Sequence, residues 1–152
     1  MNNTLLEKPA RAWRGGQPRS NSQEACLERP KYGVLIVDDD PCVRGLLGVW
    51  LQKDGFAVWL AASGQEALEL YQQHADEIQV VLLDVRMPGL DGPQTLAALR
   101  QLNPSVRSCF MSGGFGRYSE EVLRGLGAVS ILRKPFPPAE AAELLWQLAD
   151  SA

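Results

Sequence analysis

One pattern constrains the fold of this chain more than any other. Short apolar runs alternate with helix-like segments five times between Tyr32 and the last residues. The apolar runs are the expected strands, at residues 34–37, 56–60, 78–83, 106–111 and 129–132. After each run, the spacing of apolar residues or the capping residues indicate a helix. Such alternation predicts an α/β fold in which helices cover both faces of a five-stranded parallel sheet.

Local signals mark where several helices begin. Asp40 stands before a proline, as at an N-cap followed by the first helical residue. Ser63 with Glu66, and Asp91 with Gln94, have the spacing of a capping box. In the first helix, apolar residues recur at intervals of three and four, which predicts one buried face. These residues are Val43, Leu46, Leu47, Trp50 and Leu51.

Charge divides the chain into two parts. Residues 1–31 carry six basic and three acidic side chains among Pro, Gly, Ser and Asn, whereas residues 32–152 carry nine basic and fifteen acidic ones. We therefore expect a flexible N-terminal extension over 1–31 and one folded domain over 32–152. The acidic charge of that domain argues against direct binding of nucleic acid, which requires Lys and Arg for phosphate contacts.

Several other classes of protein are excluded by what the sequence lacks. No apolar run approaches the length of a membrane span, and the N-terminus has no secretory signal. The three cysteines, at positions 26, 42 and 109, have no metal or redox spacing, which indicates reduced thiols in the cytoplasm. Since His74 is the only histidine, a catalytic or zinc site built on histidine is not expected.

Polar residues follow four of the five expected strands. Asp38 and Asp39 come after the first, Asp84 after the third, Ser112 after the fourth and Lys134 after the fifth. The carboxyl ends of parallel strands share one edge of the sheet, where α/β proteins bind ligands. Carboxylates crowded together repel one another, and Mg²⁺ with its preference for oxygen ligands resolves that conflict.

The same residues suit phosphoryl chemistry. A hydroxyl and an ammonium beside a magnesium site neutralise the oxygens of a phosphoryl group, and a carboxylate such as Asp84 can act as the nucleophile to form an acyl phosphate. The sequence has no glycine-rich loop of the kind that holds a nucleotide. The phosphoryl donor is therefore expected to be something other than bound ATP.

Four stretches, in this order and each after an expected strand, make the chain resemble the receiver domain of bacterial two-component response regulators. They are VLIVDDDP at 34–41, LLDVRMPGLDG at 82–92, MSGG at 111–114 and LRKPF at 132–136. The resemblance implies a flavodoxin-like, doubly wound sheet of order 2-1-3-4-5. It also implies a partner that donates phosphohistidine, either a sensor histidine kinase or a histidine phosphotransfer protein.

The resemblance assigns roles to individual residues. Asp84 takes the place of the phosphoacceptor, Ser112 of the switch hydroxyl and Lys134 of the residue that pairs with the phosphate. The Mg²⁺ ligands that it implies are Asp39, Asp84 and the backbone carbonyl of Arg86, with Asp38 acting largely through water. A cis Lys134–Pro135 bond is expected. Ile131 departs from the family, which usually has an aromatic residue there.

We therefore expect a phosphorylation switch that catalyses only its own phosphorylation and dephosphorylation, and is not otherwise an enzyme. The chain ends just after the last helix, which suggests the single-domain type, signalling by protein contact through its fourth helix, fifth strand and fifth helix. Two alternatives stay open. One is a pseudo-receiver that binds partners without phosphorylation. The other is a haloacid-dehalogenase-like phosphatase, although its nucleophile would follow the first strand, whereas Asp84 follows the third.

Overall fold

The structure, a computed structural model, describes residues 32–114 and 116–151. The expected flexible extension, 1–31, lies outside these residues. Five parallel strands form one sheet of order β2-β1-β3-β4-β5, as expected. The strands are β1 (Gly33–Val37), β2 (Ala57–Ala61), β3 (Val80–Asp84), β4 (Arg107–Ser112) and β5 (Ser130–Arg133). The helices are α1 (Pro41–Lys53), α2 (Gly64–His74), α3 (Gly92–Leu102), α4 (Glu120–Gly125) and α5 (Pro138–Asp150).

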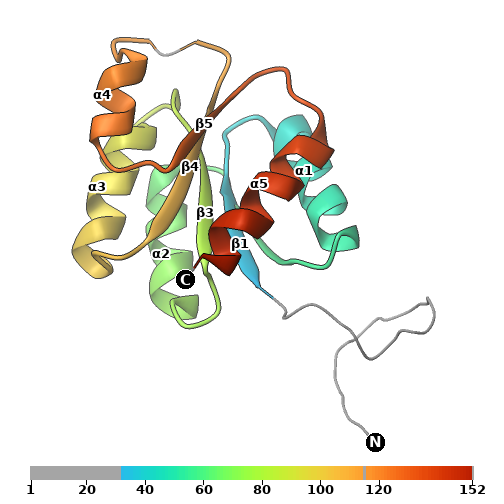
Figure 1. The fold of residues 1–152 in the computed structure, drawn as a ribbon. Coiled ribbons are helices and arrows are strands. Elements are labelled where there is room, and N and C mark those ends of the chain that lie inside the picture. The colour runs from blue at the N-terminus through green and yellow to red at the C-terminus, as the bar shows by residue number, and fades with distance from the viewer. Residues whose placement is uncertain (1–31, 115, 152) are drawn as a thin grey trace, which may run out of the picture. The chain divides into compact units, whose positions relative to one another are not determined.

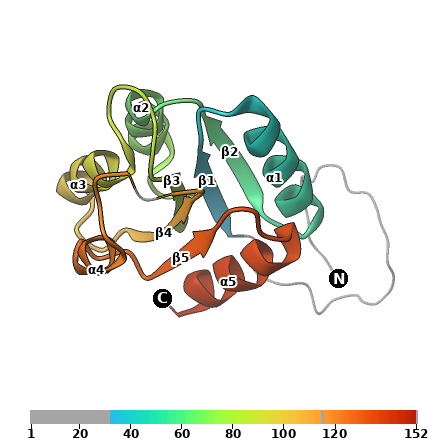
Figure 2. The ribbon, with the colours of Figure 1, turned by 90° about the horizontal axis from the view of Figure 1, so that it is seen from above.

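Helices cover both faces of the sheet, with α1 and α5 on one face and α2, α3 and α4 on the other (Figures 1 and 2). The side chains of β1 alternate between the two apolar layers that result. Val34 and Ile36 belong to the layer that includes Leu51 of α1, while Leu35 and Val37 belong to the layer that includes Leu99 of α3. All four β1 side chains are fully buried, each stabilising the fold by about 1.5–3 kcal/mol. None of the described helices has both the length and the apolar character needed to cross a membrane.

Four strands, β2 to β5, end one residue later than the sequence predicted, and in β3 and β4 the added residue belongs to the expected site. β3 includes Asp84 and β4 includes Ser112. Asp84 pairs with Met111 in the sheet, and the N–H of Val85 donates to the carbonyl of Met111 at 3.0 Å. The N–H of Lys134 donates to the carbonyl of Ser112 at 2.8 Å. The sheet itself therefore holds the backbone of these site residues.

The first helix buries a narrower face than predicted. Leu47 and Leu51 are buried, but Leu46 is 60% exposed and Trp50 is 42% exposed. Val49, on the same helix, is 56% exposed. Leu46 comes directly before the buried Leu47, and Trp50 comes directly before the buried Leu51. Neighbouring residues point about 100° apart around the helix axis. The sheet therefore covers only one stripe of α1, and an apolar stripe is left at the surface of the described domain.

A buried hydroxyl in β4 supports a prediction about stability. Ser108 is fully buried, lies on the same face of β4 as Phe110, and has no hydrogen-bond partner for its hydroxyl among the described residues. Because an unpaired buried hydroxyl loses its hydration without compensation, Ser108→Ala is expected to raise the free energy of unfolding by about 1 kcal/mol. Urea unfolding measures this, with exposed Ser105→Ala as the control that stays unchanged. A lower stability of Ser108→Ala would contradict the prediction.

Candidate functional site

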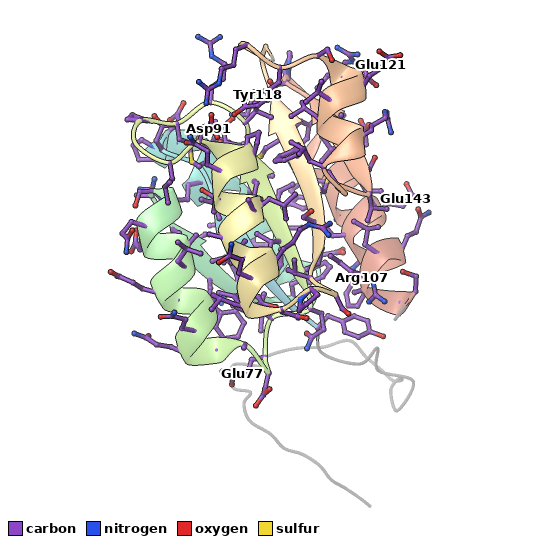
Figure 3. All side chains as sticks on the ribbon, turned by 90° about the vertical axis from the view of Figure 1, so that its left-hand side faces the viewer. Glu77, Asp91, Arg107, Tyr118, Glu121 and Glu143 are labelled. Atoms are coloured by element: carbon purple, nitrogen blue, oxygen red, sulfur yellow. The ribbon has the colours of Figure 1, made fainter. Side chains whose placement is uncertain are left out.

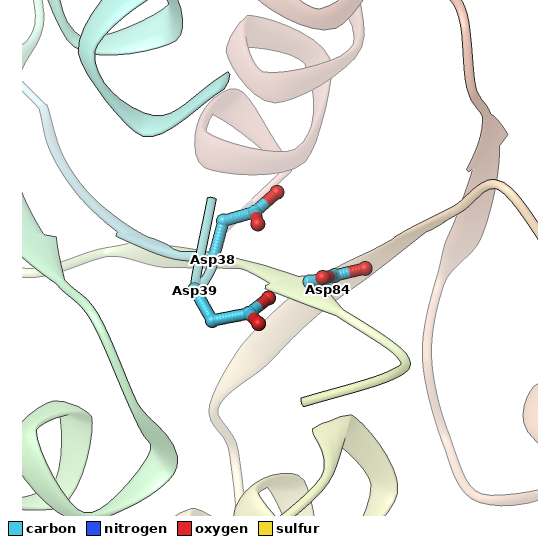
Figure 4. A group of neighbouring side chains, drawn as sticks. All are labelled: Asp38, Asp39 and Asp84. Carbon is cyan, nitrogen blue, oxygen red and sulfur yellow. The ribbon is translucent and has the colours of Figure 1, made fainter. Parts of the chain in front are cut away.

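Three carboxylates meet at the carboxyl ends of β1 and β3 (Figure 4). Asp38 and Asp39 follow β1 directly, and Asp84 is the last residue of β3. These strands are neighbours in the sheet, which is why residues distant in sequence come together. One oxygen from each carboxylate lies within 4.8 Å of the others. Asp38 is fully buried and Asp84 is 6% exposed, whereas Asp39 is open to solvent.

Asp38 is held by three different residues. Its Oδ1 accepts the backbone N–H of Asp40 at 2.9 Å, and its Oδ2 accepts the ammonium of Lys134 at 2.9 Å. The guanidinium of Arg44, in the second turn of α1, donates to the carbonyl oxygen of Asp38 at 2.8 Å. Because both oxygens of this carboxylate already have donors, Asp39 and Asp84 have more capacity left for a cation. Sequence reasoning missed Arg44, since an arginine on a helix is usually exposed.

Lys134 joins two of the acids. Its Nζ lies 2.9 Å from Oδ2 of Asp38 and 3.5 Å from Oδ1 of Asp84. Burial lowers the pKa of Lys134, but its hydrogen bonds to both acids and their charges together raise that pKa above its usual value. The ammonium is therefore charged throughout the physiological range. The Lys134–Pro135 bond is cis, as the resemblance implied.

The surroundings of Asp84 disfavour its ionised form. Burial raises its pKa most, the charge of Asp38 raises it further, and Lys134 offsets only part of this, so that the pKa of Asp84 rises from 3.8 to about 6. A cation bound among the carboxylates would relieve this repulsion. The atoms that the three acids offer to a metal ion are all carboxylate oxygens, the type of ligand that Mg²⁺ prefers, whereas zinc sites use nitrogen and sulfur ligands as well. The residues present therefore fit the expected magnesium ion.

Ser112 lies at the same edge of the sheet, but its hydroxyl is engaged within its own loop. Its Oγ accepts the N–H of Gly114 at 2.9 Å and donates to the carbonyl of Gly114. The side chain is buried, 3% exposed. In this arrangement, then, the expected switch hydroxyl bonds to backbone groups two residues further along the chain. Ile131, the departure from the family pattern, is partly buried against the apolar layer under α2 and α3.

The start of α3 packs directly against the strand that carries Asp84. The N–H of Gly92 donates to the carbonyl of Val85 at 2.9 Å, and a Cβ atom at Gly92 would lie 2.4 Å from the carbonyl oxygen of Asp84. Only glycine permits this approach. Asp91 caps the helix, and the capping box with Gln94 is confirmed in both directions.

Arg86, which follows Asp84 by two residues, lies along the loop after β4. A Cβ atom at Gly114 would be 3.6 Å from its guanidinium, and one at Gly116 would be 3.5 Å from its aliphatic carbons. Gly116 also has a φ of +63°, a conformation that favours glycine. The long side chain of Arg86 thus connects the loop after β3 with the loop after β4.

Comparisons with known proteins agree with this geometry. Residues 34–145 match the response regulator receiver domain family. The sensor kinase CckA of Brucella abortus is 38% identical over 122 residues, which are 77% of this chain but 12% of that kinase. Sporulation initiation phosphotransferase F of Bacillus subtilis is 31% identical over 103 residues, covering 68% of this chain and 82% of that protein. The structure of chemotaxis protein CheY4 of Vibrio cholerae has a TM-score of 0.71 at 28% identity, covering 78% of this chain and 99% of that one.

Proposed function

The chain belongs to the family of response regulator receiver domains of two-component signalling, and on that premise we propose that it is a phosphorylation switch with Asp84 as the phosphoacceptor. Members of this family are signalling switches rather than ordinary enzymes. The observation that carries the proposal is the position of Asp84 at the end of β3, among Asp38, Asp39 and Lys134. This arrangement suits phosphoryl transfer to a carboxylate, which depends mainly on positioning and on neutralisation of charge.

The proposed reaction is a displacement at phosphorus. A carboxylate oxygen of Asp84 forms a bond to phosphorus while the phosphorus–nitrogen bond of a partner's phosphohistidine breaks, and the imidazole leaves with the bonding electrons. Lys134 is placed to neutralise an oxygen of the transferred group, since its ammonium already contacts Asp84 at 3.5 Å. Ser112 would donate its hydroxyl to another phosphoryl oxygen after leaving Gly114.

A magnesium ion would supply further charge neutralisation, held by Asp39, Asp84 and the backbone carbonyl of Arg86, with Asp38 acting largely through water. The acid cluster and the raised pKa of Asp84 support this assignment. Arg44 contributes by fixing the carbonyl of Asp38, and so the loop from which two of these carboxylates project.

We propose that the signal leaves through the face formed by α4, β5 and α5. The backbone N–H of Lys134 donates to the backbone carbonyl of Ser112, so the chain just after β5 is tied to the residue that carries the expected switch hydroxyl. Three apolar side chains on and just after α4 are exposed: Val122 at 49%, Leu126 at 41% and Val129 at 52%. Exposed apolar side chains that gather on one face suit contact with another protein.

The donor that we propose is a histidine kinase or a histidine phosphotransfer protein in the cytoplasm, where the free thiols of Cys42 and Cys109 would stay reduced. The exposed apolar stripe of Leu46, Val49 and Trp50 offers the donor a surface on α1, the helix that follows Asp38 and Asp39 in the chain. Nothing in the described residues favours the phosphatase, because the candidate nucleophile ends β3 and not β1. The acetyl phosphate experiment described next distinguishes the phosphorylation switch from the pseudo-receiver.

The test uses acetyl phosphate as a small donor that needs no partner protein. Incubated with acetyl phosphate and Mg²⁺, the chain is expected to gain the mass of one phosphoryl group. The reason is that the ionised carboxylate of Asp84, its charge offset by Mg²⁺ and Lys134, can attack phosphorus. Intact-mass spectrometry measures the gain, and a parallel sample with EDTA is the control that should gain nothing. A chain that gains no mass with Mg²⁺ contradicts the proposal and points to the pseudo-receiver. An equal gain in EDTA contradicts the proposed role of Mg²⁺.

A further inference from the structure

The loop between β4 and α4 is fastened to the start of α3 by hydrogen bonds between side chains that take no part in the proposed phosphoryl chemistry. The hydroxyl of Tyr118 donates to Oδ2 of Asp91 at 2.8 Å, and Arg117 lies 3.3 Å from the same oxygen. Figure 3 shows Tyr118 and Asp91 close together at the same end of the molecule. The other oxygen of Asp91 accepts the N–H of Gln94 at 2.9 Å and so caps α3. We name the Tyr118–Asp91 contact the Asp91–Tyr118 bridge.

The bridge crosses an open groove beside the phosphoacceptor. The groove has a volume of about 440 Å³ and is lined on one side by residues 85–88, which follow Asp84 directly. Residues 116–118 line the other side, and Asp91 also borders it. The two loops that flank Asp84 are therefore joined across this groove at a position seven residues after Asp84 and six residues after Ser112.

The near end of the same loop is fastened by Ser112. Its hydroxyl bonds to both backbone groups of Gly114, so it has to give up the carbonyl of Gly114 before it can donate to a phosphoryl group on Asp84. The described residues that follow Ser112 would then have to move, and the Asp91–Tyr118 bridge, which holds the far end of the loop, opposes that movement. A contact made in only one of two states shifts the equilibrium toward that state.

We propose that the Asp91–Tyr118 bridge holds the loop after β4 in its unphosphorylated arrangement and breaks when Ser112 engages the phosphoryl group. Tyr118 is thus a positioning residue that opposes phosphorylation through Ser112. The inference rests on the proposed function of Asp84. The half-buried position of the Tyr118 ring, packed against the apolar layer under α2 and α3, makes the bridge stronger than a contact between two exposed side chains.

The test is the affinity of the full chain for beryllofluoride, a phosphoryl mimic, in the presence of Mg²⁺, measured by calorimetry. Tyr118→Phe keeps the ring and removes the hydroxyl. It is expected to bind about three- to tenfold more tightly than the wild type, the effect of losing one half-exposed side-chain hydrogen bond in the free state only. Asp91→Asn, which keeps an oxygen for the cap but loses the charge, is expected to shift the affinity in the same direction by less.

Two comparisons separate this role from a merely structural one. Tyr71→Phe removes another buried hydroxyl, one that accepts the amide N–H of Asn103 at 2.9 Å beyond the opposite end of α3, and should leave the affinity unchanged. When Ser112→Ala is already present, Tyr118→Phe should no longer tighten binding, because the bridge acts through that hydroxyl.

The outcomes distinguish the two proposals. If the wild type binds beryllofluoride but Tyr118→Phe binds equally or more weakly, the bridge proposal is wrong while the role of Asp84 stands. If Tyr118→Phe tightens binding just as much in the Ser112→Ala background, coupling through Ser112 is wrong. If the wild type does not bind beryllofluoride at all, the proposed function fails, and the bridge proposal fails with it.

Discussion

Replacing Asp84 by asparagine is expected to abolish the mass gain with acetyl phosphate and, at neutral pH without Mg²⁺, to make the chain more stable. The loss of phosphorylation follows because the amide is not the nucleophile that a carboxylate is. The gain in stability follows because the ionised carboxylate is disfavoured by burial and by Asp38. A pKa of about 6 in place of 3.8 corresponds to about 3 kcal/mol, which partial access of solvent reduces to about 2 kcal/mol.

The sign and range of this pH dependence follow from the raised pKa. Below about pH 4 the Asp84 carboxyl is protonated in both the folded and the unfolded chain, so the wild type and Asp84→Asn should then have equal stability. Between about pH 4 and 6 the unfolded chain ionises first, and the wild type loses stability relative to the variant. Above about pH 6 the difference is constant.

Urea unfolding across this pH range measures the difference, and Asp76→Asn is the matched control because Asp76 is exposed. Its effect on stability should stay within about 0.5 kcal/mol. A phosphorylated Asp84→Asn chain would show that another residue accepts the phosphoryl group. If Asp84→Asn were less stable than the wild type at neutral pH, burial and the charge of Asp38 would not disfavour the ionised Asp84 carboxylate.

Replacing Lys134 by glutamine is expected to have the opposite effect on stability. Without Mg²⁺ the free energy of unfolding should fall by about 3 kcal/mol, because the buried carboxylate of Asp38 loses its 2.9 Å ammonium partner and repels Asp84 without compensation. Phosphorylation by acetyl phosphate should slow at least about tenfold, since a cation that neutralises the transferred group is gone.

Chemical denaturation and the time course of intact mass measure the two effects of Lys134→Gln. Millimolar Mg²⁺ should restore more stability to this variant than to the wild type, because the ion compensates the same charges. Lys53→Gln, an exposed lysine at the end of α1, is the control. An unchanged rate of phosphorylation in Lys134→Gln would remove Lys134 from the proposed chemistry.

The class of fold and the strand order could be predicted from the sequence, because alternation of strands and helices together with four short motifs leaves few arrangements. The ends of the strands were predicted less accurately. Asp84 and Ser112 belong to β3 and β4 because of hydrogen bonds to neighbouring strands, which no local pattern records. The exposed positions of Leu46 and Trp50 likewise depend on how much of α1 the sheet covers.

The acids and Lys134 of the site could be predicted because parallel strands place their carboxyl ends together. The contacts of Arg44 with Asp38 and of Tyr118 with Asp91 could not. The first depends on the rotamer of a long side chain, and the second joins residues 27 positions apart across a groove. Each is a matter of three-dimensional packing, and neither residue type has a motif that marks it.

The separation between the buried stripe of α1 and its exposed stripe has a consequence for how such domains diversify. Leu47 and Leu51 are needed for the core, whereas Leu46, Val49 and Trp50 are exposed and take no part in the hydrogen bonds described for the acids. The outer residues can therefore change freely in descendants of this chain while the fold and the chemistry stay constant.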